Sequence, residues 1–399
     1  MTRTADSTKL RGQLVAELER RELIKSERVR EAFLAVPREL FVPDFAAREG
    51  LAAVYRDEAI LTKFNEHGIP LSSSSQPAIM ALMLEQLELE EGMRVLEVGA
   101  GTGYNAALLS LLAGKRGRVV SVDVDAQITA EARRALRDGG YRVRVVHADG
   151  RAGFAQPAPY DRIIVTASAD AVPRAWFEQL ADDGLLVAPL RLHSTGAQAI
   201  PVLRRTPRGF RSLRALSGGF MPLRGAGDDG SGKPPWEPCL NVTDLSSDGR
   251  EPLLQLNGVA LATLSRPAKR RLLATALGKP RKRRLGLRAD HGALGLYVSL
   301  TLPKSRLVSC FPSFGIGAIS RDGASLALIE ARPDRPKVDF LKAYGGSEAE
   351  ELLLERVGEW ARRGRPAEPD LEITVTYEED TSRLAVRWPP TSPKGAQSG

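Results

Sequence analysis

The feature that most constrains this fold is a glycine-rich turn that directly follows a short apolar run. The sequence reads VLEVGAGTGY over residues 95–104, and the apolar residues 105–113 that follow have the composition of a buried helix. Glycine allows a tight turn and a close approach of a ligand to the backbone, and the N-terminus of the next helix favours negative charge. A strand, this turn and a helix in succession indicate an α/β sheet with a small-molecule site at the strand end.

Apolar strands and helices alternate around this turn. Strands are expected at residues 94–98, 118–122, 143–147, 162–166 and 184–189. Helices are expected at residues 10–40, 78–87, 105–113, 126–138 and 173–180, an irregular segment at residues 55–75, and closing antiparallel strands at residues 199–223. The alternation predicts a parallel sheet with helices on both faces.

A second region begins after the run GAGDDGSGKPP, which has the composition of a linker. Beyond it, we expect short strands at residues 295–302, 325–330, 371–377 and 384–388, and a helix near residues 347–363. We therefore predict a first domain at residues 1–225 (a helical part at 10–75 and a ligand-binding core at 76–225), a linker at 226–238, a C-terminal α+β domain at 239–390 and a disordered tail at 391–399.

Composition excludes several kinds of site and location. No apolar run approaches the ~20 residues that span a bilayer, and the polar N-terminus lacks the apolar segment of a signal peptide. We therefore expect a cytoplasmic protein with no membrane partner. Two cysteines, Cys239 and Cys310, and four histidines without ligand spacing predict no metal site and no disulfide framework.

Positive charge is concentrated in one segment. The chain has a formal net charge of +8, and residues 266–288 contain ten Lys or Arg and no Asp or Glu. This basic segment suits an acidic peptide or a nucleic acid, although a solvated basic surface explains it equally well. The segment lacks interleaved aromatic residues, which argues against a site where single-stranded nucleic acid stacks.

The spacing around the turn separates two kinds of cofactor. A dinucleotide fingerprint requires glycine where Tyr104 stands, whereas the pattern E-x-G-x-G-x-G, from Glu97 to Gly103, is typical of enzymes that use S-adenosylmethionine. The next strand ends at Asp123, whose carboxylate suits ribose hydroxyls, and the third ends at Asp149. The predicted cofactor-binding residues are Glu97, Gly99, Ala100, Gly101, Thr102, Gly103, Tyr104, Asp123, Val124, Asp149 and Gly150.

Four further motifs carry a resemblance to a known family. They are VPRELFVP at residues 36–43, SQP at 75–77, APYDRIIVT at 158–166 and DGLLVAP at 183–189. Over residues 10–225 the chain resembles the protein L-isoaspartate O-methyltransferases. The resemblance implies a Rossmann-like S-adenosylmethionine methyltransferase fold with an additional C-terminal α+β domain. It also implies that Ser75 carries the hydroxyl nearest the transferring methyl group.

Two departures from that family are similar to one of its branches. Residues 61–75 are longer and more polar than the family's run and end in four serines, and the chain continues well beyond residue 225. Both features, with Asn105 and GGFMPLRG at 218–225, resemble the methyltransferases of lanthipeptide and graspetide systems, including the FxLD group. That branch implies methylation of an aspartate in a modified precursor peptide, leading through succinimide to isoaspartate. The alternative is repair of isoaspartyl proteins. A binding protein with a degenerate core is disfavoured, since the glycine pattern is intact.

A carboxylate acceptor sets modest chemical demands. Its pKa lies near 4, so at neutral pH it needs no general base, and the enzyme's task is alignment. We expect Ser75 to orient the acceptor as the catalytic residue, with an N-cap of the next helix as its alternative role. Candidate substrate-binding residues are Lys63, Ser74, Gln76 and Thr166. The basic segment is the candidate site for the precursor peptide.

Overall fold

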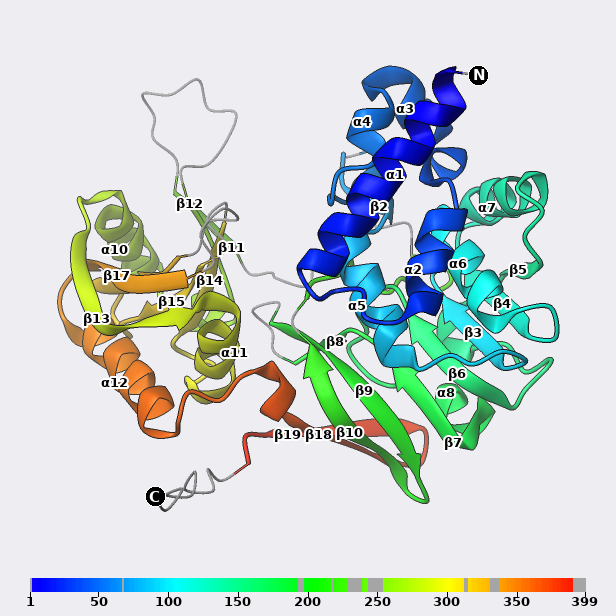
Figure 1. Ribbon diagram of the computed structural model, residues 1–399. Coiled ribbons are helices and arrows are strands. Elements are labelled where there is room, and N and C mark those ends of the chain that lie inside the picture. Colours follow the sequence, from blue (N-terminus) through cyan, green and yellow to red (C-terminus); the bar gives the residue numbers. More distant parts are fainter. Residues whose placement is uncertain are drawn as a thin grey trace, which may run out of the picture.

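A computed structural model describes residues 2–66, 68–192, 197–216, 218–228, 239–242, 254–311, 315–330 and 337–389. Two lobes, each built around one β-sheet, lie side by side (Figure 1). Most of the predicted linker and the whole predicted tail lie outside the described residues.

The first sheet has the predicted parallel core. Its strands are β3 (Arg94–Val98), β4 (Arg118–Asp123), β5 (Val143–His147), β6 (Tyr160–Val165) and β7 (Leu180–Val187), in the order β7-β6-β3-β4-β5. Three antiparallel strands extend the sheet beyond β7: the short β8 (Leu190–Arg191), then β9 (Gln198–Thr206) and β10 (Gly209–Leu216). All five predicted parallel strands are confirmed.

Helices cover both faces of this sheet because neighbouring strand residues point to opposite sides. Val95 packs in one core and Leu96 in the other, and both are fully buried. The helices of this lobe are α1 (Thr2–Arg20), α2 (Glu27–Ala35), α3 (Pro43–Glu49), α4 (Leu51–Val54), α5 (Pro77–Leu87), α6 (Tyr104–Ala113), α7 (Ala126–Asp138) and α8 (Arg174–Gln179), with 3-10 turns η1 (Arg38–Phe41) and η2 (Gly150–Ala152).

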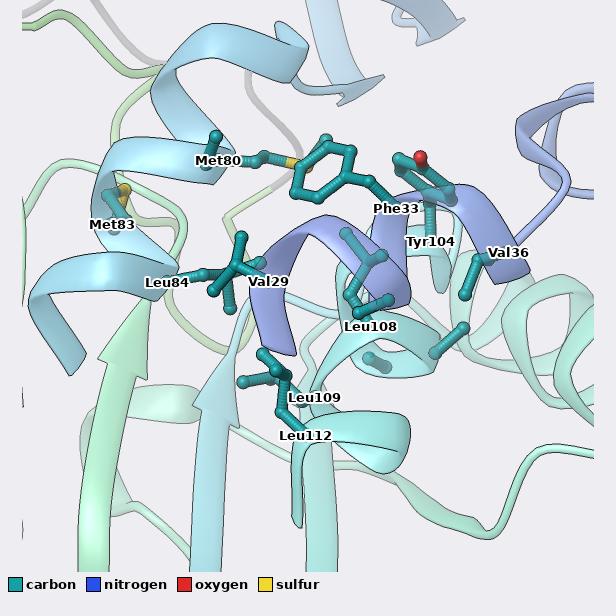
Figure 2. Packing of buried hydrophobic residues seen from close by; sticks show 14 of the residues in the cluster. Val29, Phe33, Val36, Met80, Met83, Leu84, Tyr104, Leu108, Leu109 and Leu112 are labelled. Carbon is teal, nitrogen blue, oxygen red and sulfur yellow. The ribbon is translucent and has the colours of Figure 1, made fainter. Parts of the chain in front are cut away.

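The N-terminal helices are attached to the glycine-rich turn through aromatic packing. Figure 2 shows α2 lying between α5 and α6, with Phe33 directed towards Tyr104 and Met80. The ring centroids of Phe33 and Tyr104 are 6.4 Å apart, and those of Phe41 and Tyr104 are 5.7 Å apart. Tyr104 therefore joins the VPRELF segment to the first turn of α6.

The segment predicted to be irregular, residues 55–75, instead contains a β-hairpin. Its strands are β1 (Ile60–Phe64) and β2 (Pro70–Ser74), which pair antiparallel and form a separate small sheet. The expectation of an irregular segment was wrong because a serine-rich strand lacks the apolar alternation that reveals strands. The pairing with β1 and the packing of β2 against the glycine-rich turn replace that signal.

The second lobe is an antiparallel sheet with helices on both faces. The strand order is β11 (Cys239–Val242), β12 (Leu254–Asn257), β14 (Leu307–Phe311), β15 (Gly315–Ile319), β16 (Ser325–Ile329), β17 (Lys337–Gly345) and β13 (Arg281–Asp290). The helices α9 (Ala260–Thr263) and α10 (Arg266–Leu277) share one core, and α11 (His291–Thr301) and α12 (Glu348–Arg362) share the other. The predicted combination of a Rossmann-like lobe with an additional α+β lobe is confirmed.

Two expectations for this region were wrong. Residues 295–302 lie mainly in helix α11, whose N-cap Asp290 accepts a hydrogen bond from Ala293 N (3.3 Å). Periodicity cannot separate a short apolar strand from a buried helix, so the sequence was ambiguous here. Strands β18 (Glu372–Glu378) and β19 (Thr381–Arg387), which follow the 3-10 turn η3 (Glu368–Asp370), were correctly predicted as strands but join the first sheet, beside β10 (Figure 1).

Candidate active site

A cavity of about 460 Å³ opens at the carboxyl ends of β3, β4 and β6. The glycine-rich turn and the end of β4 form one wall, and the serine-rich segment with the first turn of α5 forms another. Lining segments lie at residues 71–76, 98–102, 122–124 and 218–224. The fold therefore brings the glycine-rich turn and the serine-rich segment, which are separate in the sequence, together at the carboxyl edge of the sheet. Ligands of open α/β sheets bind at this edge.

Glycine is required in the turn for two different contacts. At Gly101, where φ is +50°, an added Cβ would lie 3.2 Å from the carbonyl oxygen of Ser73. At Gly99, where φ is +99°, it would lie 2.4 Å from Thr166 Oγ1. Because Gly101 has no side chain, Ser73 of β2 can approach the turn closely, and because Gly99 has none, Thr166, which follows β6, can do the same. Gly103 serves packing instead, with Leu136 and Ala132 beside it, and lies outside the cavity lining.

Asp123 lies in the cavity wall at the end of β4, where the ribose of the cofactor was expected. Its carboxylate accepts hydrogen bonds from the backbone N–H of Gly101 (3.1 Å) and of Asp125 (3.1 Å). Burial raises the pKa of Asp123, while these N–H donors and Arg224 act in the opposite direction. Val124 and Gly150 also line the cavity, as do Ala100, Thr102 and Tyr104.

Glu97 lies behind the cavity wall rather than in it. Its carboxylate is fully buried and accepts hydrogen bonds from Asn105 Nδ2 (2.8 Å) and Ser121 Oγ. Burial raises the pKa of Glu97 to about 7. In this structure Glu97 therefore holds the start of α6 against β3 and β4. Asn105 itself lines the cavity, and its Oδ1 is buried without a hydrogen-bond partner in the described part of the chain.

Asp149 also lies outside the cavity lining. Arg151 pairs with it, with Nη2 2.6 Å from Oδ2 and Nε 3.0 Å from Oδ1, and Ala226 N donates to it at 3.0 Å. The Arg151 hydrogen bonds lower the pKa of Asp149 to about 2. Asp149 thus fastens residues 218–228 over the end of β5 rather than presenting a free carboxylate to adenine.

The serine segment presents Ser75 to the cavity. Gln76 is the N-cap residue of α5, but its side chain makes no capping hydrogen bond to the helix. Asp57 takes the capping role, since its Oδ1 accepts from Ala78 N (2.8 Å), and Gln76 Nε2 donates to Asp57 O (3.0 Å) and Oδ2 (3.1 Å). The alternative role of Ser75 as N-cap is therefore wrong. Ser75 is one of the residues that line the cavity, and its hydroxyl has no hydrogen-bond partner among the described residues.

The other predicted substrate residues have structural partners. Lys63 lies outside the cavity lining, with Nζ 2.8 and 2.9 Å from the carboxylate oxygens of Asp125, the N-cap of α7. Burial raises the pKa of Asp125, but the Lys63 hydrogen bond and backbone N–H donors outweigh it and leave a lowered pKa. Thr166 lines the cavity and donates to Gly99 O at 2.6 Å. Ser74, also in the lining, accepts from Arg38.

Sequence analysis did not select several residues that build this site. They are Arg38, Asp57 and Asn105, together with the segment 218–224 as part of the cavity wall. The charged pair Arg38 and Glu39 inside the mainly apolar VPRELFVP run was the available signal for Arg38. Asp57 carried no signal, because its role depends on contacts with residues about twenty positions away.

In the residues that the structure describes, no group of three or more His, Cys, Asp or Glu is arranged to hold a metal ion. No described helix is long and apolar enough to cross a membrane. Cys310 is buried and not disulfide-bonded, and the side chain of Cys239 lies outside the described residues.

Comparisons with known proteins agree with this geometry. The family model described as protein-L-isoaspartate(D-aspartate) O-methyltransferase matches residues 9–225. A protein-L-isoaspartate O-methyltransferase of Thermotoga maritima is 42% identical over 168 residues, which are 42% of this chain and 51% of that protein. Its namesake from Ignicoccus hospitalis is 35% identical over 215 residues, which are 53% of this chain and 95% of that protein.

One solved structure extends the similarity to both lobes. It is a protein-L-isoaspartate O-methyltransferase with 26% sequence identity and a TM-score of 0.53, and the match covers 94% of this chain and 99% of that one. A chain that continues beyond residue 225 is therefore not peculiar to the peptide-modifying branch. This corrects our expectation that the second lobe separates the chain from the parent family.

Proposed function

The chain belongs to the protein-L-isoaspartate(D-aspartate) O-methyltransferase family, whose model matches more than half of it, and we propose that its cavity methylates an aspartate-derived carboxylate of a peptide. Members of this family are carboxyl methyltransferases that depend on S-adenosylmethionine.

The cavity has the features that S-adenosylmethionine requires. Gly99 and Gly101 line the cavity with bare backbone, and the Asp123 carboxylate lies at the end of the neighbouring strand. The buried, unpartnered Oδ1 of Asn105 adds an acceptor at the same wall. When bound, S-adenosylmethionine supplies an electrophilic methyl group on a sulfonium.

The observation that carries the proposal is that, among the residues that the structure describes, no proton acceptor lies at the acceptor end of the cavity. Among the described lining residues, the ionisable ones are Arg21, Tyr104, Asp123 and Arg224. Asp123 lies at the ribose end, and burial raises the pKa of Tyr104. An alcohol or amine acceptor would need a base, whereas a carboxylate is already ionised at neutral pH. Such a site can work by holding the acceptor oxygen in line with the methyl group.

Ser75 is the group that we assign to orient that oxygen. Its hydroxyl has no other hydrogen-bond partner in the described residues, so it can donate to a carboxylate. The first turn of α5, which begins two residues later at Pro77, adds the positive end of a helix dipole to the same wall. Together they favour an anion at the acceptor position.

The chemistry after transfer needs no further catalyst. The carboxylate becomes a methyl ester and the cofactor leaves as S-adenosylhomocysteine. The backbone nitrogen after the aspartyl residue then attacks the ester carbonyl, loses its proton, and expels methanol to close a succinimide. Water opens the imide to isoaspartate or aspartate. A flexible following residue such as glycine permits the ring closure.

As the specific substrate we propose an aspartate in a ribosomally made, modified precursor peptide, as in lanthipeptide, graspetide or FxLD systems. The β1–β2 hairpin beside the cavity supports this, because Leu61 and Phe64 remain 46% and 50% exposed and offer apolar surface to a bulky peptide. The basic segment 266–288, which spans α10 and β13, is the proposed contact for an acidic part of that peptide. Lys269, Arg270, Lys282 and Arg284 have no carboxylate partner within the described residues.

The second candidate is repair of isoaspartyl residues in damaged proteins. The names of the similar proteins favour it, and the two-lobed solved structure removes one argument against it. Mass spectrometry of two peptides incubated with the enzyme and S-adenosylmethionine separates the candidates. One is a linear isoaspartyl peptide, and the other is a cyclised precursor that contains normal aspartate.

The two candidates predict opposite results in this experiment. Tailoring gives a gain of one methyl ester on the precursor alone, followed by a product one water lighter than the starting peptide. Methylation of the linear isoaspartyl peptide, with an unmodified precursor, would establish repair and reject the tailoring proposal.

A further inference from the structure

A buried arginine lies directly behind the serine segment. Arg38 belongs to the η1 turn, and its side chain has 0% exposure. Burial lowers its pKa, yet a guanidinium keeps its charge inside proteins. Arg38 is absent from the cavity lining, so it reaches the cavity only through the residues it holds.

All donor groups of this guanidinium are used, and they connect two segments of the chain. They reach oxygen atoms of the segment before β1 and of the serine segment. These are Val54 O (2.8 Å) and Arg56 O (3.1 Å) from Nη1, Glu58 O (2.9 Å), Ser75 O (3.0 Å) and Ser74 O (3.3 Å) from Nη2, and Ser74 Oγ (3.4 Å) from Nε.

None of these acceptors is a carboxylate, so the charge of Arg38 is not neutralised by a direct partner. The carboxylate of Asp57 influences it at longer range, but that group is shared by Arg21, Gln76 and the backbone N–H of Ala78. A buried cation is unfavourable unless an anion compensates it. The wall that Arg38 supports is the one against which the acceptor carboxylate is proposed to bind.

We infer that Arg38 is a positioning residue for methyl transfer, which fixes the carbonyls of Ser74 and Ser75 and makes the acceptor wall electropositive. This inference rests on the proposed carboxylate acceptor. The hydrogen bonds set where the Ser75 hydroxyl points, because the peptide that bears it cannot rotate while its carbonyl is held. The positive charge favours the anionic acceptor and not the cationic sulfonium, so its effect falls on peptide binding rather than on the cofactor.

Two substitutions separate the geometry from the charge. Arg38→Lys keeps the charge but cannot bind both segments, since an ammonium lacks the planar fork of five donors. We expect its kcat to fall about 10- to 100-fold, as small misplacements of reacting groups do, with KM for the peptide changed less than about threefold. Arg38→Gln also removes the charge. We expect it to lower kcat similarly and in addition to raise KM for the peptide about tenfold.

Binding of S-adenosylhomocysteine separates a positioning role from a merely structural one. If Arg38 only stabilised the fold, its substitution would weaken cofactor binding as well. Isothermal titration should give both variants a Kd within about twofold of the unmodified enzyme, because the hydrogen bonds of Arg38 go to the segment before β1 and to the serine segment, and none goes to the glycine-rich turn. The matched control is Arg162→Gln. Arg162 likewise donates to backbone carbonyls, those of Leu87 (2.6 Å), Asp161 (2.9 Å) and Glu88 (3.0 Å), but lies outside the cavity lining.

Clear outcomes overturn the inference. A folded Arg38→Lys enzyme with unchanged kcat rejects the positioning role, and equal kinetic losses in Arg38→Gln and Arg162→Gln attribute the effect to stability alone. If Arg38→Gln does not fold, Arg38→Lys decides by its kcat. The proposed function fails separately, because an unmodified enzyme that methylates neither test peptide contradicts it. The Arg38 inference is tested with an active unmodified enzyme, and either of the two kinetic outcomes above overturns it there.

Discussion

The two walls of the cavity are built in different ways. The cofactor wall comes from one strand–turn–helix unit, residues 94–113, with Asp123 contributed by the next strand. The acceptor wall combines residues 71–76 with 218–224, and its geometry depends on Arg38 and Asp57. The first wall is a local structure whose residues are near one another in sequence. The second exists only through tertiary contacts.

The largest expected effect is a loss of cofactor binding, caused by a substitution in the cofactor wall. In Gly101→Val a β-branched side chain would occupy a backbone with φ of +50° and press on Ser73 O. Strain of this kind should weaken S-adenosylhomocysteine binding about 100-fold or more in isothermal titration. Gly12→Ala is the control, because a Cβ there meets no atom within 4 Å. Unchanged binding by a folded Gly101→Val protein would show that the cofactor lies elsewhere.

The next effect should fall on the acceptor wall alone. Ser75→Ala removes the hydroxyl that we assign to orient the carboxylate, and kcat should fall about 10- to 100-fold while the Kd for S-adenosylhomocysteine stays constant. Steady-state kinetics with the accepted peptide gives both numbers. Ser73→Ala, two residues earlier in the serine segment, is the matched control and should lose little. Full turnover by Ser75→Ala would reject the role of this residue.

A third prediction concerns the pH dependence of the cofactor wall. Burial raises the pKa of Glu97 to about 7, above the ~4.3 of an exposed glutamate. The folded state therefore holds this proton more tightly, and the stabilisation present below pH ~4 is lost as the pH rises towards 7. Glu97→Gln is neutral at every pH. Between pH 5 and pH 8 its free energy of unfolding should therefore rise by about 1–3 kcal/mol relative to that of the unmodified enzyme.

Urea denaturation at both pH values measures this difference. The exposed Glu90, changed to Gln, serves as control and should show no such trend. If Glu97→Gln loses stability at pH 8, the ionised carboxylate and its bonds to Asn105 and Ser121 are what the fold requires, and the predicted sign is wrong.

The smallest effect on cofactor binding is expected at the ion pair between Lys63 and Asp125. Lys63 connects β1 to Asp125, and both side chains are partly exposed, at 26% and 14%. Partly exposed ion pairs contribute little, so Lys63→Met should raise the Kd for S-adenosylhomocysteine only about two- to fivefold, with a weaker effect at high salt. The exposed Lys115→Met is the control. A loss as large as that of Gly101→Val would make Lys63 part of the binding site itself.

Sequence reasoning succeeded where structure is local. The five parallel strands, the helices between them and the glycine-rich turn were predicted because each has its own periodicity or turn chemistry. The same reasoning grouped Glu97 and Asp149 with the cofactor residues, although side-chain partners hold both outside the cavity lining. Position at a strand end predicts proximity to a site, but burial and pairing decide whether a carboxylate faces it.

By itself, the sequence determined the Rossmann-like lobe and the family and predicted a place for the cofactor, because these depend on short patterns and on the order of elements. Only the tertiary structure decided that β18 and β19 complete the first sheet, that residues 55–75 include a hairpin over the turn, and that Asp57 rather than Ser75 caps α5. Each of these depends on a partner distant in the chain. Hydrogen bonds and burial between such partners leave no periodic trace in the sequence, since their energy arises only once the chain has folded.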